Sequence, residues 1–126
     1  MLKEAVRAII ATDQNEVLLV KRADGIEKDK YCLPGGKVDV GETNEQAVTR
    51  EIKEELGLDF DPKDSFMISN DSWKTTYFTG NTSGQIKIDT NEVSGVVYLS
   101  GKKLDTVDIA FDHKSILEDY FYLSML

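Results

Sequence analysis

Three glutamates at positions 51, 54 and 55 have the residue type and the spacing of a metal-binding cluster. If the segment is helical, successive side chains turn by about 100°, and Glu51, Glu54 and Glu55 share an arc of about 100°. Like charges at these spacings destabilise a helix, and no Lys or Arg lies three or four residues from Glu55 within it. Carboxylate oxygens suit Mg²⁺ and Mn²⁺, so the cluster favours a divalent metal site over a solvated face of ion pairs.

The pattern from Asn44 to Leu56 predicts the helix that carries these glutamates. Thr43 is placed to cap its N-terminus, Gln46 to complete a capping box, and Gly57 to end it. An apolar stripe runs beside the glutamates and is made up of Val48, Ile52 and Leu56. The carboxylates therefore lie at the border of the buried face. Arg50 falls outside their arc, where it could reach back toward the preceding loop.

Gly35 and Gly36 follow Leu33-Pro34 and interrupt regular structure ahead of the helix. Glycine allows backbone conformations that other residues avoid and lets a backbone come close to a ligand. A Gly-Gly pair alone would be read as an ordinary turn. Placed directly before the glutamate helix, it indicates part of a phosphate and metal site.

The segment from Gly36 to Leu58, GKVDVGETNEQAVTREIKEELGL, resembles the signature of the Nudix family, which includes MutT-like proteins. It agrees at every defined position, namely Gly36, Glu42, Arg50, Glu51, Ile52, Glu54, Glu55, Gly57 and Leu58. The strict resemblance covers these 23 residues, and the rest of the chain follows the family's layout more loosely.

This resemblance implies an α/β (α+β) sandwich, with a mixed β-sheet flanked by helices, that directs water onto a phosphorus of a nucleoside diphosphate derivative. It implies Mg²⁺ or Mn²⁺ as the cofactor. Glu51, Glu54 and Glu55 then resemble the catalytic metal ligands, and the carbonyl of Gly35 resembles a further ligand. Glu42 and Arg50 resemble the pair that locks the loop against the helix.

The general base varies within the family and stays open here. The run that begins at Glu92 resembles the downstream segment in which many members place a catalytic glutamate, with a solvated turn residue as the alternative role for Glu92. Gly36, Lys37 and Arg22 are candidates for phosphate contacts, as is Lys21, with an ordinary surface role as the alternative for the cations.

The residues that bind the base stay unassigned. Four aromatic residues could stack on a base but are more typical of a core, namely Tyr31, Trp73, Phe78 and Phe111. His113, the only histidine, lies near where some family members contact the base, but we expect a capping or surface role for it.

The remaining pattern predicts strands on both sides of the central helix. Glu4–Ala11 and Glu16–Lys21 are expected to form an antiparallel hairpin in one sheet. Further strands are expected at Phe66–Asn70, Lys74–Thr79, Gln85–Ile88 and Val96–Leu99, loops at Ala23–Lys30 and Gly80–Gly84, and a closing helix at Asp112–Leu123. This order predicts a mixed sheet covered by helices.

Length and composition predict one domain over residues 1–126. The net charge of −8 argues against binding a nucleic-acid polymer, and a polyanionic substrate would need an intervening cation. No apolar run is long enough to cross a membrane, and no secretory signal is recognised. Cys32 is the single cysteine, which favours the cytoplasm. We expect a monomer or homodimer, and the apolar end, residues 120–126, could close the core or form a dimer contact.

The expected partner is a small nucleotide. The only prolines are Pro34 and Pro62, so the proline that marks many ADP-ribose hydrolases is missing, as is the marker of NADH-cleaving members. The compact length, without an extension before the first strand, resembles MutT-type nucleoside triphosphatases first and dinucleoside polyphosphate hydrolases second. The alternatives are a non-catalytic nucleotide-sensing or protein-binding module, and a prenyl diphosphate isomerase using a cysteine, for which Cys32 lies before the signature.

Overall fold

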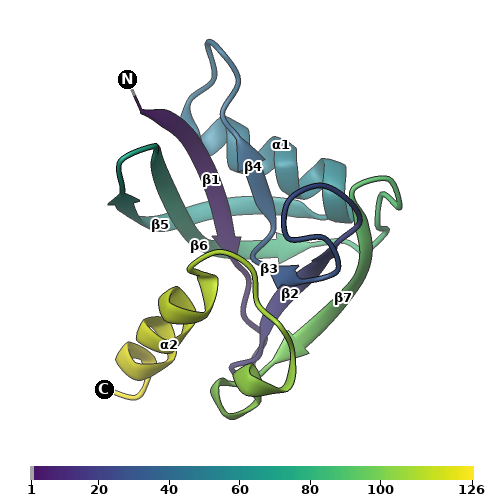
Figure 1. Cartoon of the computed structure of the whole chain (residues 1–126), viewed down its shortest axis with the longest axis vertical. Helices are drawn as coiled ribbons and strands as arrows, with labels where there is room; N and C mark the ends of the chain where they lie inside the picture. Colours follow the sequence, from purple (N-terminus) through teal and green to yellow (C-terminus); the bar gives the residue numbers. More distant parts are fainter. Residues whose placement is uncertain (1) are drawn as a thin grey trace. The chain divides into compact units, whose positions relative to one another are not determined.

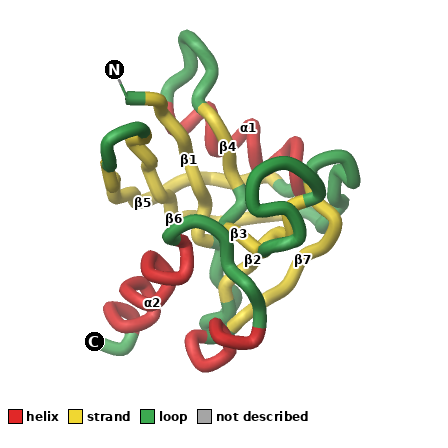
Figure 2. The backbone as a smooth tube through the Cα atoms, viewed as in Figure 1, coloured by secondary structure: helices red, strands yellow, loops and turns green. Residues whose placement is uncertain are grey.

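The computed structural model describes residues 2–126, which form two compact units. The first unit, here called unit 1, consists of residues up to 10 together with residues 34–89. The second, unit 2, consists of residues 11–33 and 90–126. Each unit has its own β-sheet and one α-helix of twelve or thirteen residues. Figure 2 shows these helices in red and the strands in yellow.

Unit 1 is built on a four-stranded sheet in the order β4 (Gly35–Lys37), β1 (Lys3–Ile9), β6 (Trp73–Ser83) and β5 (Asp59–Ser69). Strand β1 runs antiparallel to β4 and parallel to β6, and β5 runs antiparallel to β6 (Figure 1). The sheet is therefore mixed. A register shift between Pro62 and Asp64 interrupts the regular pairing of β5 with β6, as a β-bulge does.

The helix of unit 1, α1 (Asn44–Leu56), has the bounds predicted from the sequence. Both hydrogen bonds of the capping box between Thr43 and Gln46 are present, and Gly57 ends the helix in the left-handed conformation at φ 70°. Its apolar stripe is fully buried and consists of Ala47, Val48, Ile52 and Leu56. Helix α1 contacts β1, β4 and β5, and this packing fixes which face of the helix turns away from the sheet.

Unit 2 has a three-stranded sheet in the order β3 (Tyr31–Cys32), β2 (Val17–Arg22) and β7 (Val93–Leu99). Strand β2 is antiparallel to both neighbours and has its first four residues buried. A 3₁₀ helix, η1 (Gly101–Thr106), follows β7, and α2 (His113–Ser124) ends the unit. The predicted closing helix is confirmed, one residue later at each end.

The expected hairpin between the first two strands is wrong. Strand β1 belongs to the sheet of unit 1 and β2 to that of unit 2, so they do not share a sheet. Only the tip is hairpin-like, with an N–H of Thr12 donating to the carbonyl of Glu16 and a bridge between Ala11 and Val17. Strands β1 and β2 each pair with strands that are distant in the sequence. These long-range pairings, and not the short turn between β1 and β2, decide which sheet each strand joins.

The expected strand at Gln85–Ile88 is also wrong, and so is the expected loop at Gly80–Gly84, because β6 continues to Ser83. Residues 85–88 run instead past the end of α1. There the N–H of Lys87 donates to the carbonyl of Leu56, and the N–H of Asp89 donates to that of Glu55. Carbonyls in the last turn of a helix have no partner within the helix, so this segment satisfies them instead of joining a sheet.

The fold class predicted from the sequence, a mixed α and β structure with helices and a mixed sheet, is confirmed, although the strands form two sheets where one was expected. Among residues 2–126, no helix has both the length and the apolar character needed to cross a membrane.

Candidate functional site

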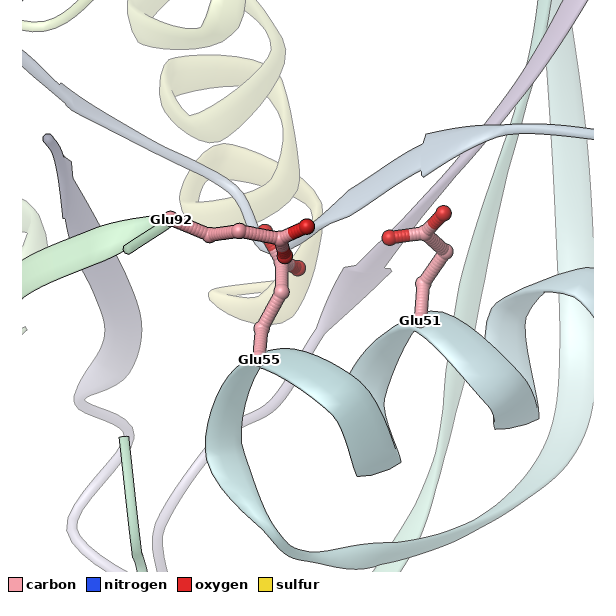
Figure 3. A group of neighbouring side chains, drawn as sticks. All are labelled: Glu51, Glu55 and Glu92. Carbon is pink, nitrogen blue, oxygen red and sulfur yellow. The ribbon is translucent and has the colours of Figure 1, made fainter. Parts of the chain in front are cut away.

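Glu51 and Glu55 lie one helical turn apart on α1, and their side chains leave the helix on the same side (Figure 3). A carboxylate oxygen of one lies within 4.8 Å of a carboxylate oxygen of the other. Glu55 is buried, with 8% of its surface exposed. Glu51 keeps 13% of its side chain exposed. Two carboxylates held this close and away from bulk water repel each other, and a divalent cation between them would remove that cost.

Two glycines of β4 make room for these carboxylates. The N–H of Gly35 donates a hydrogen bond of 2.8 Å to Oε1 of Glu55. Gly35 has a φ of 149°, and a side chain there would collide with the backbone of Val6 on β1. A Cβ added at Gly36 would lie 2.7 Å from the carboxylate of Glu51. The backbone of β4 thus comes against both glutamates at positions where only glycine fits.

Arg50, in the middle of α1, joins this helix to the loop before it. Its Nε and Nη2 donate to the two carboxylate oxygens of Glu42, at 2.7 and 3.0 Å, in a bidentate pair. Nη2 also donates to the carbonyl of Lys37 at 3.1 Å, and Asp39 adds an ion pair at 3.4 Å. This ion pair of Asp39 could not be predicted from the sequence, because nothing in the spacing of Asp39 indicates Arg50 as its partner.

The pKa values of the pair follow from this geometry. The hydrogen bond from Arg50, followed by that from the N–H of Asp39, lowers the pKa of Glu42 from about 4.5 to about 2. The hydrogen bond to Glu42 is also the main cause of the raised pKa of Arg50. Both groups are therefore charged throughout the neutral range.

Glu54 is held differently from its two neighbours. Nη1 of Arg50 lies 3.2 Å from Oε2 of Glu54 and 3.0 Å from Oε1 of Glu51, so one guanidinium nitrogen serves both carboxylates. The side chain of Glu54 is half exposed, at 49%. Of the three glutamates singled out from the sequence, the structure brings the carboxylates of Glu51 and Glu55 together and directs that of Glu54 toward Arg50.

The other candidate residues are distributed over both units. Glu92, also labelled in Figure 3, belongs to unit 2, directly before β7, and its carbonyl accepts a hydrogen bond from Ala23 at 3.2 Å. Arg22 donates from Nε to the carbonyl of Ile26 at 2.8 Å, and its guanidinium lies 4.9 Å from the centroid of the Phe111 ring.

Lys37 lies on the sheet face opposite α1. Side chains alternate along a strand, and the neighbouring Gly36 faces Glu51 of α1. The ammonium of Lys37 lies 5.8 Å from the ring centroid of Trp73 on β6. In this conformation Lys37 therefore contacts an aromatic ring and points away from the glutamates of α1.

The expected capping or surface role of His113 is wrong. Only 3% of the residue is exposed, and Nδ1 accepts a hydrogen bond of 3.0 Å from the N–H of Leu33. The N-cap residue of α2 is its neighbour Asp112. A partner 80 positions away leaves no signal in the local pattern, so the sequence could not indicate this bond.

Two of the aromatic residues considered for base stacking differ in exposure. Phe78 is buried, whereas Phe111 is half exposed with a positive φ of 59°.

The donor set in unit 1 fits a hard divalent cation. It offers carboxylate oxygens within 4.8 Å of each other, next to backbone that has no side chains in the way. Mg²⁺ and Mn²⁺ bind through such oxygens, and neither needs a thiolate or imidazole.

Comparisons with known proteins agree with this arrangement. The protein-family model described as the NUDIX domain matches residues 1–120 of this chain. An ADP-ribose pyrophosphatase of Methanocaldococcus jannaschii is 35% identical over 92% of this chain and 71% of its own length. An 8-oxo-dGTP diphosphatase of Escherichia coli is 47% identical over 51 residues, 40% of each chain. The crystal structure of a MutT NUDIX hydrolase from Burkholderia pseudomallei has a TM-score of 0.76 at 26% identity, covering 94% of this chain and 97% of that one.

Proposed function

Because this chain belongs to the Nudix hydrolase family, we propose that it uses Mg²⁺ or Mn²⁺ to hydrolyse a diphosphate linkage in a nucleoside diphosphate derivative. The observation that supports this most directly is the approach of the Glu51 and Glu55 carboxylates to within 4.8 Å, beside the glycines of β4. A purely structural helix would gain nothing from two adjacent carboxylates shielded from water.

The residues that would hold the ion are Glu51, Glu54 and Glu55, together with the carbonyl of Gly35. When bound, the ion would neutralise phosphate charge and lower the pKa of a water molecule. Glu54 forms its ion pair with Arg50, which also holds Glu51, so Arg50 would limit the repulsion among the three glutamates. The Glu42–Arg50 pair would hold the loop between β4 and α1 in place, and Arg50 also holds the end of β4 through the carbonyl of Lys37.

A carboxylate would accept the proton of the attacking water as its oxygen bonds to phosphorus. The bridging P–O bond breaks, and its electron pair leaves with the departing phosphate group. Glu92 is our first candidate for this base, with one of the α1 glutamates as the alternative. Gly36, Lys37 and Arg22 are candidates for contacts to the remaining phosphate oxygens, and for Lys37 this would require its ammonium to leave Trp73.

For the substrate, we propose a nucleoside triphosphate first, with a dinucleoside polyphosphate as a related possibility. The similarity to the 8-oxo-dGTP diphosphatase of Escherichia coli supports the triphosphate. ADP-ribose is the second candidate, because the ADP-ribose pyrophosphatase of Methanocaldococcus jannaschii is similar over most of this chain.

A nucleotide panel tests the proposal and separates these candidates. The chain would be assayed with Mg²⁺ and with Mn²⁺ against dGTP, 8-oxo-dGTP, a diadenosine polyphosphate and ADP-ribose. Pyrophosphate and a nucleoside monophosphate are expected from a triphosphate, and AMP with ribose 5-phosphate from ADP-ribose. Metal-dependent nucleotide binding without turnover would instead support a non-catalytic sensing module, and no effect of metal would overturn the proposal.

We also propose that residues 1–126 form one folding domain in the cytoplasm. The match to the NUDIX model spans parts of both units, which supports a single domain. Cys32 is buried and forms no disulfide, which is compatible with a reducing compartment. One cooperative unfolding transition is expected in calorimetry, and two separate transitions would contradict the single domain.

A further inference from the structure

Strand β5 forms one edge of the sheet in unit 1 (Figure 1), and the residues in its second half are exposed. It pairs with β6 on one side, and no other strand within residues 2–126 pairs with it on the other. Every residue from Lys63 to Ser69 is exposed. Three of them are large apolar side chains, namely Phe66, Met67 and Ile68, with exposed fractions of 42%, 50% and 39%. An apolar strand with unpaired backbone groups pairs readily with another strand.

The first half of β5 is protected against such pairing. Pro62 has no N–H, the register shift between Pro62 and Asp64 bends the strand, and Lys63 forms an ion pair with Asp61 at 2.8 Å. None of these features occurs from Ser65 to Ser69. We call residues 64–69 the open edge. The contrast within one strand indicates that the open edge is kept available for a partner strand.

We propose that the open edge pairs antiparallel with the open edge of a second copy of this chain, about a twofold axis at Met67. The sheet of unit 1 then continues across both copies. This inference goes beyond the proposed hydrolase function and does not depend on it.

The side-chain sequence selects this register. A twofold axis perpendicular to the sheet keeps each side chain on its own face, so the paired positions must add up to an even number. With Met67 opposite itself, Phe66 lies opposite Ile68 of the second copy, and Ser65 lies opposite Ser69. Pairs of an aromatic and a β-branched side chain are favourable in antiparallel sheets.

Neighbouring registers are worse. An axis at Phe66 would place the carboxylate of Asp64 opposite Ile68 of the second copy. An axis at Ile68 would place Phe66 opposite Asn70, where the chain already turns toward β6. Only the axis at Met67 sets all three apolar side chains against apolar partners.

The surrounding side chains fit a second copy of this chain. Phe66 already stacks on Tyr77, with 5.1 Å between ring centroids, so its orientation is fixed before pairing. The same register brings Lys63 toward Asp71 of the second copy at each end of the paired segment. Two chains of net charge −8 repel each other over most of their surface, so residues 65–69, which carry no charge and lie between Lys63 and Asp71, are where they can associate.

Sedimentation of the full chain over a range of concentrations tests the proposal. The chain should form dimers, and Met67→Lys should raise the dissociation constant at least about tenfold, because two ammonium groups would face each other at the axis. Met125→Lys is the matched control, since Met125 is 82% exposed outside β5 and its replacement should leave the dimer unchanged. Far-UV circular dichroism would verify that both variants fold.

Disulfide trapping gives a second, register-specific measurement. Cys32 is only 1% exposed, so Met67→Cys adds a single accessible thiol, which should form a disulfide-linked dimer on mild oxidation. Phe66→Cys should not, because it would lie opposite Ile68. A monomeric wild-type chain, a dimer unaffected by Met67→Lys, or equal trapping at positions 66 and 67 would overturn the proposal. Loss of the dimer in Met125→Lys alone would overturn it as well, in favour of the C-terminal segment.

Discussion

The backbone N–H of Gly35 donates a hydrogen bond of 2.8 Å to Oε1 of Glu55, so strand β4 and helix α1 are joined at the carboxylate that would bind metal. Burying a carboxylate costs free energy unless its charge is compensated. The N–H of Gly35 provides part of that compensation and also fixes the direction of the carboxylate. A bound cation would add to it, so metal binding and the position of β4 should be coupled.

Gly36→Ala should reduce metal affinity while the chain stays folded. The new Cβ would lie 2.7 Å from the carboxylate of Glu51 and nearest to the flexible end of that side chain, which can move away at small cost to the fold. The displaced carboxylate would then be lost from the site. Mn²⁺ titration followed by calorimetry should show affinity at least about tenfold weaker, with the melting temperature little changed.

Gly95→Ala serves as the control for Gly36→Ala. A Cβ at Gly95 meets only the side chain of Lys21 at 3.9 Å, an ordinary contact. This variant should bind Mn²⁺ as the wild type does. Normal metal affinity in Gly36→Ala would show that Glu51 does not act as a ligand in the conformation described.

Glu54→Gln should lower kcat by roughly 10³ or more if Glu54 is a metal ligand, because several kcal/mol of charge stabilisation would be lost. The ion pair with Arg50 gives an alternative role, in which the substitution would change stability slightly and leave kcat near normal. Steady-state kinetics at saturating Mn²⁺ separates the two roles.

Glu45→Gln is the matched control for Glu54→Gln, since Glu45 is an exposed glutamate in the first turn of the same helix. Its kcat should equal that of the wild type. Near-normal turnover of a folded Glu54→Gln variant would assign Glu54 to the structural network of Arg50.

The helix and its caps could be predicted from the sequence because their determinants are local. Thr43, Gln46 and Gly57 act within a few residues of the positions they stabilise, and the apolar period fixes the buried stripe. The strand pairing could not be predicted in the same way. Strand β1 pairs with β4 and with β6, which lies about 70 residues away, and the local turn after β1 carries no information about either.

The candidate site also combines features that depend on local sequence with features that depend on contacts in the folded chain. The spacing of Glu51 and Glu55 correctly places them on one side of α1, because helical geometry alone decides it. The position of the Glu54 side chain depends on Arg50. The guanidinium of Arg50 donates hydrogen bonds to Glu51 and Glu54 as well as to Glu42. Side-chain competition of this kind cannot be read from angles around a helix.

The Glu42–Arg50 pair should make stability depend on pH in the acid range. The pKa of Glu42 is lowered from about 4.5 to about 2, so the folded state binds a proton less readily than the unfolded chain. The contribution of Glu42 is therefore fully present above about pH 4.5 and is lost as the pH falls toward 2. Urea unfolding between pH 6 and pH 2 should show this loss.

Glu42→Gln isolates that contribution from the other carboxylates. The variant should be less stable than the wild type at pH 6, and the difference between the two should shrink as the pH falls through the range from about 4.5 to about 2. A difference that stays constant over this range would mean that ionisation of Glu42 does not contribute to folding.

His113→Phe should destabilise unit 2 through the amide of Leu33. The imidazole Nδ1 accepts the N–H of Leu33 at 3.0 Å in a buried setting, so the neutral ring must carry its proton on Nε2. Phenylalanine fills a similar volume but offers no acceptor, and an unsatisfied buried N–H costs about 1–3 kcal/mol. Urea unfolding at pH 7 should show a loss of this size, and the amide of Leu33 should exchange faster with deuterium.

Tyr122→Phe is the control for His113→Phe, because Tyr122 is a residue of α2 that is 65% exposed, and it should change neither measurement. Unaltered protection of the Leu33 amide in His113→Phe would show that another acceptor replaces the imidazole.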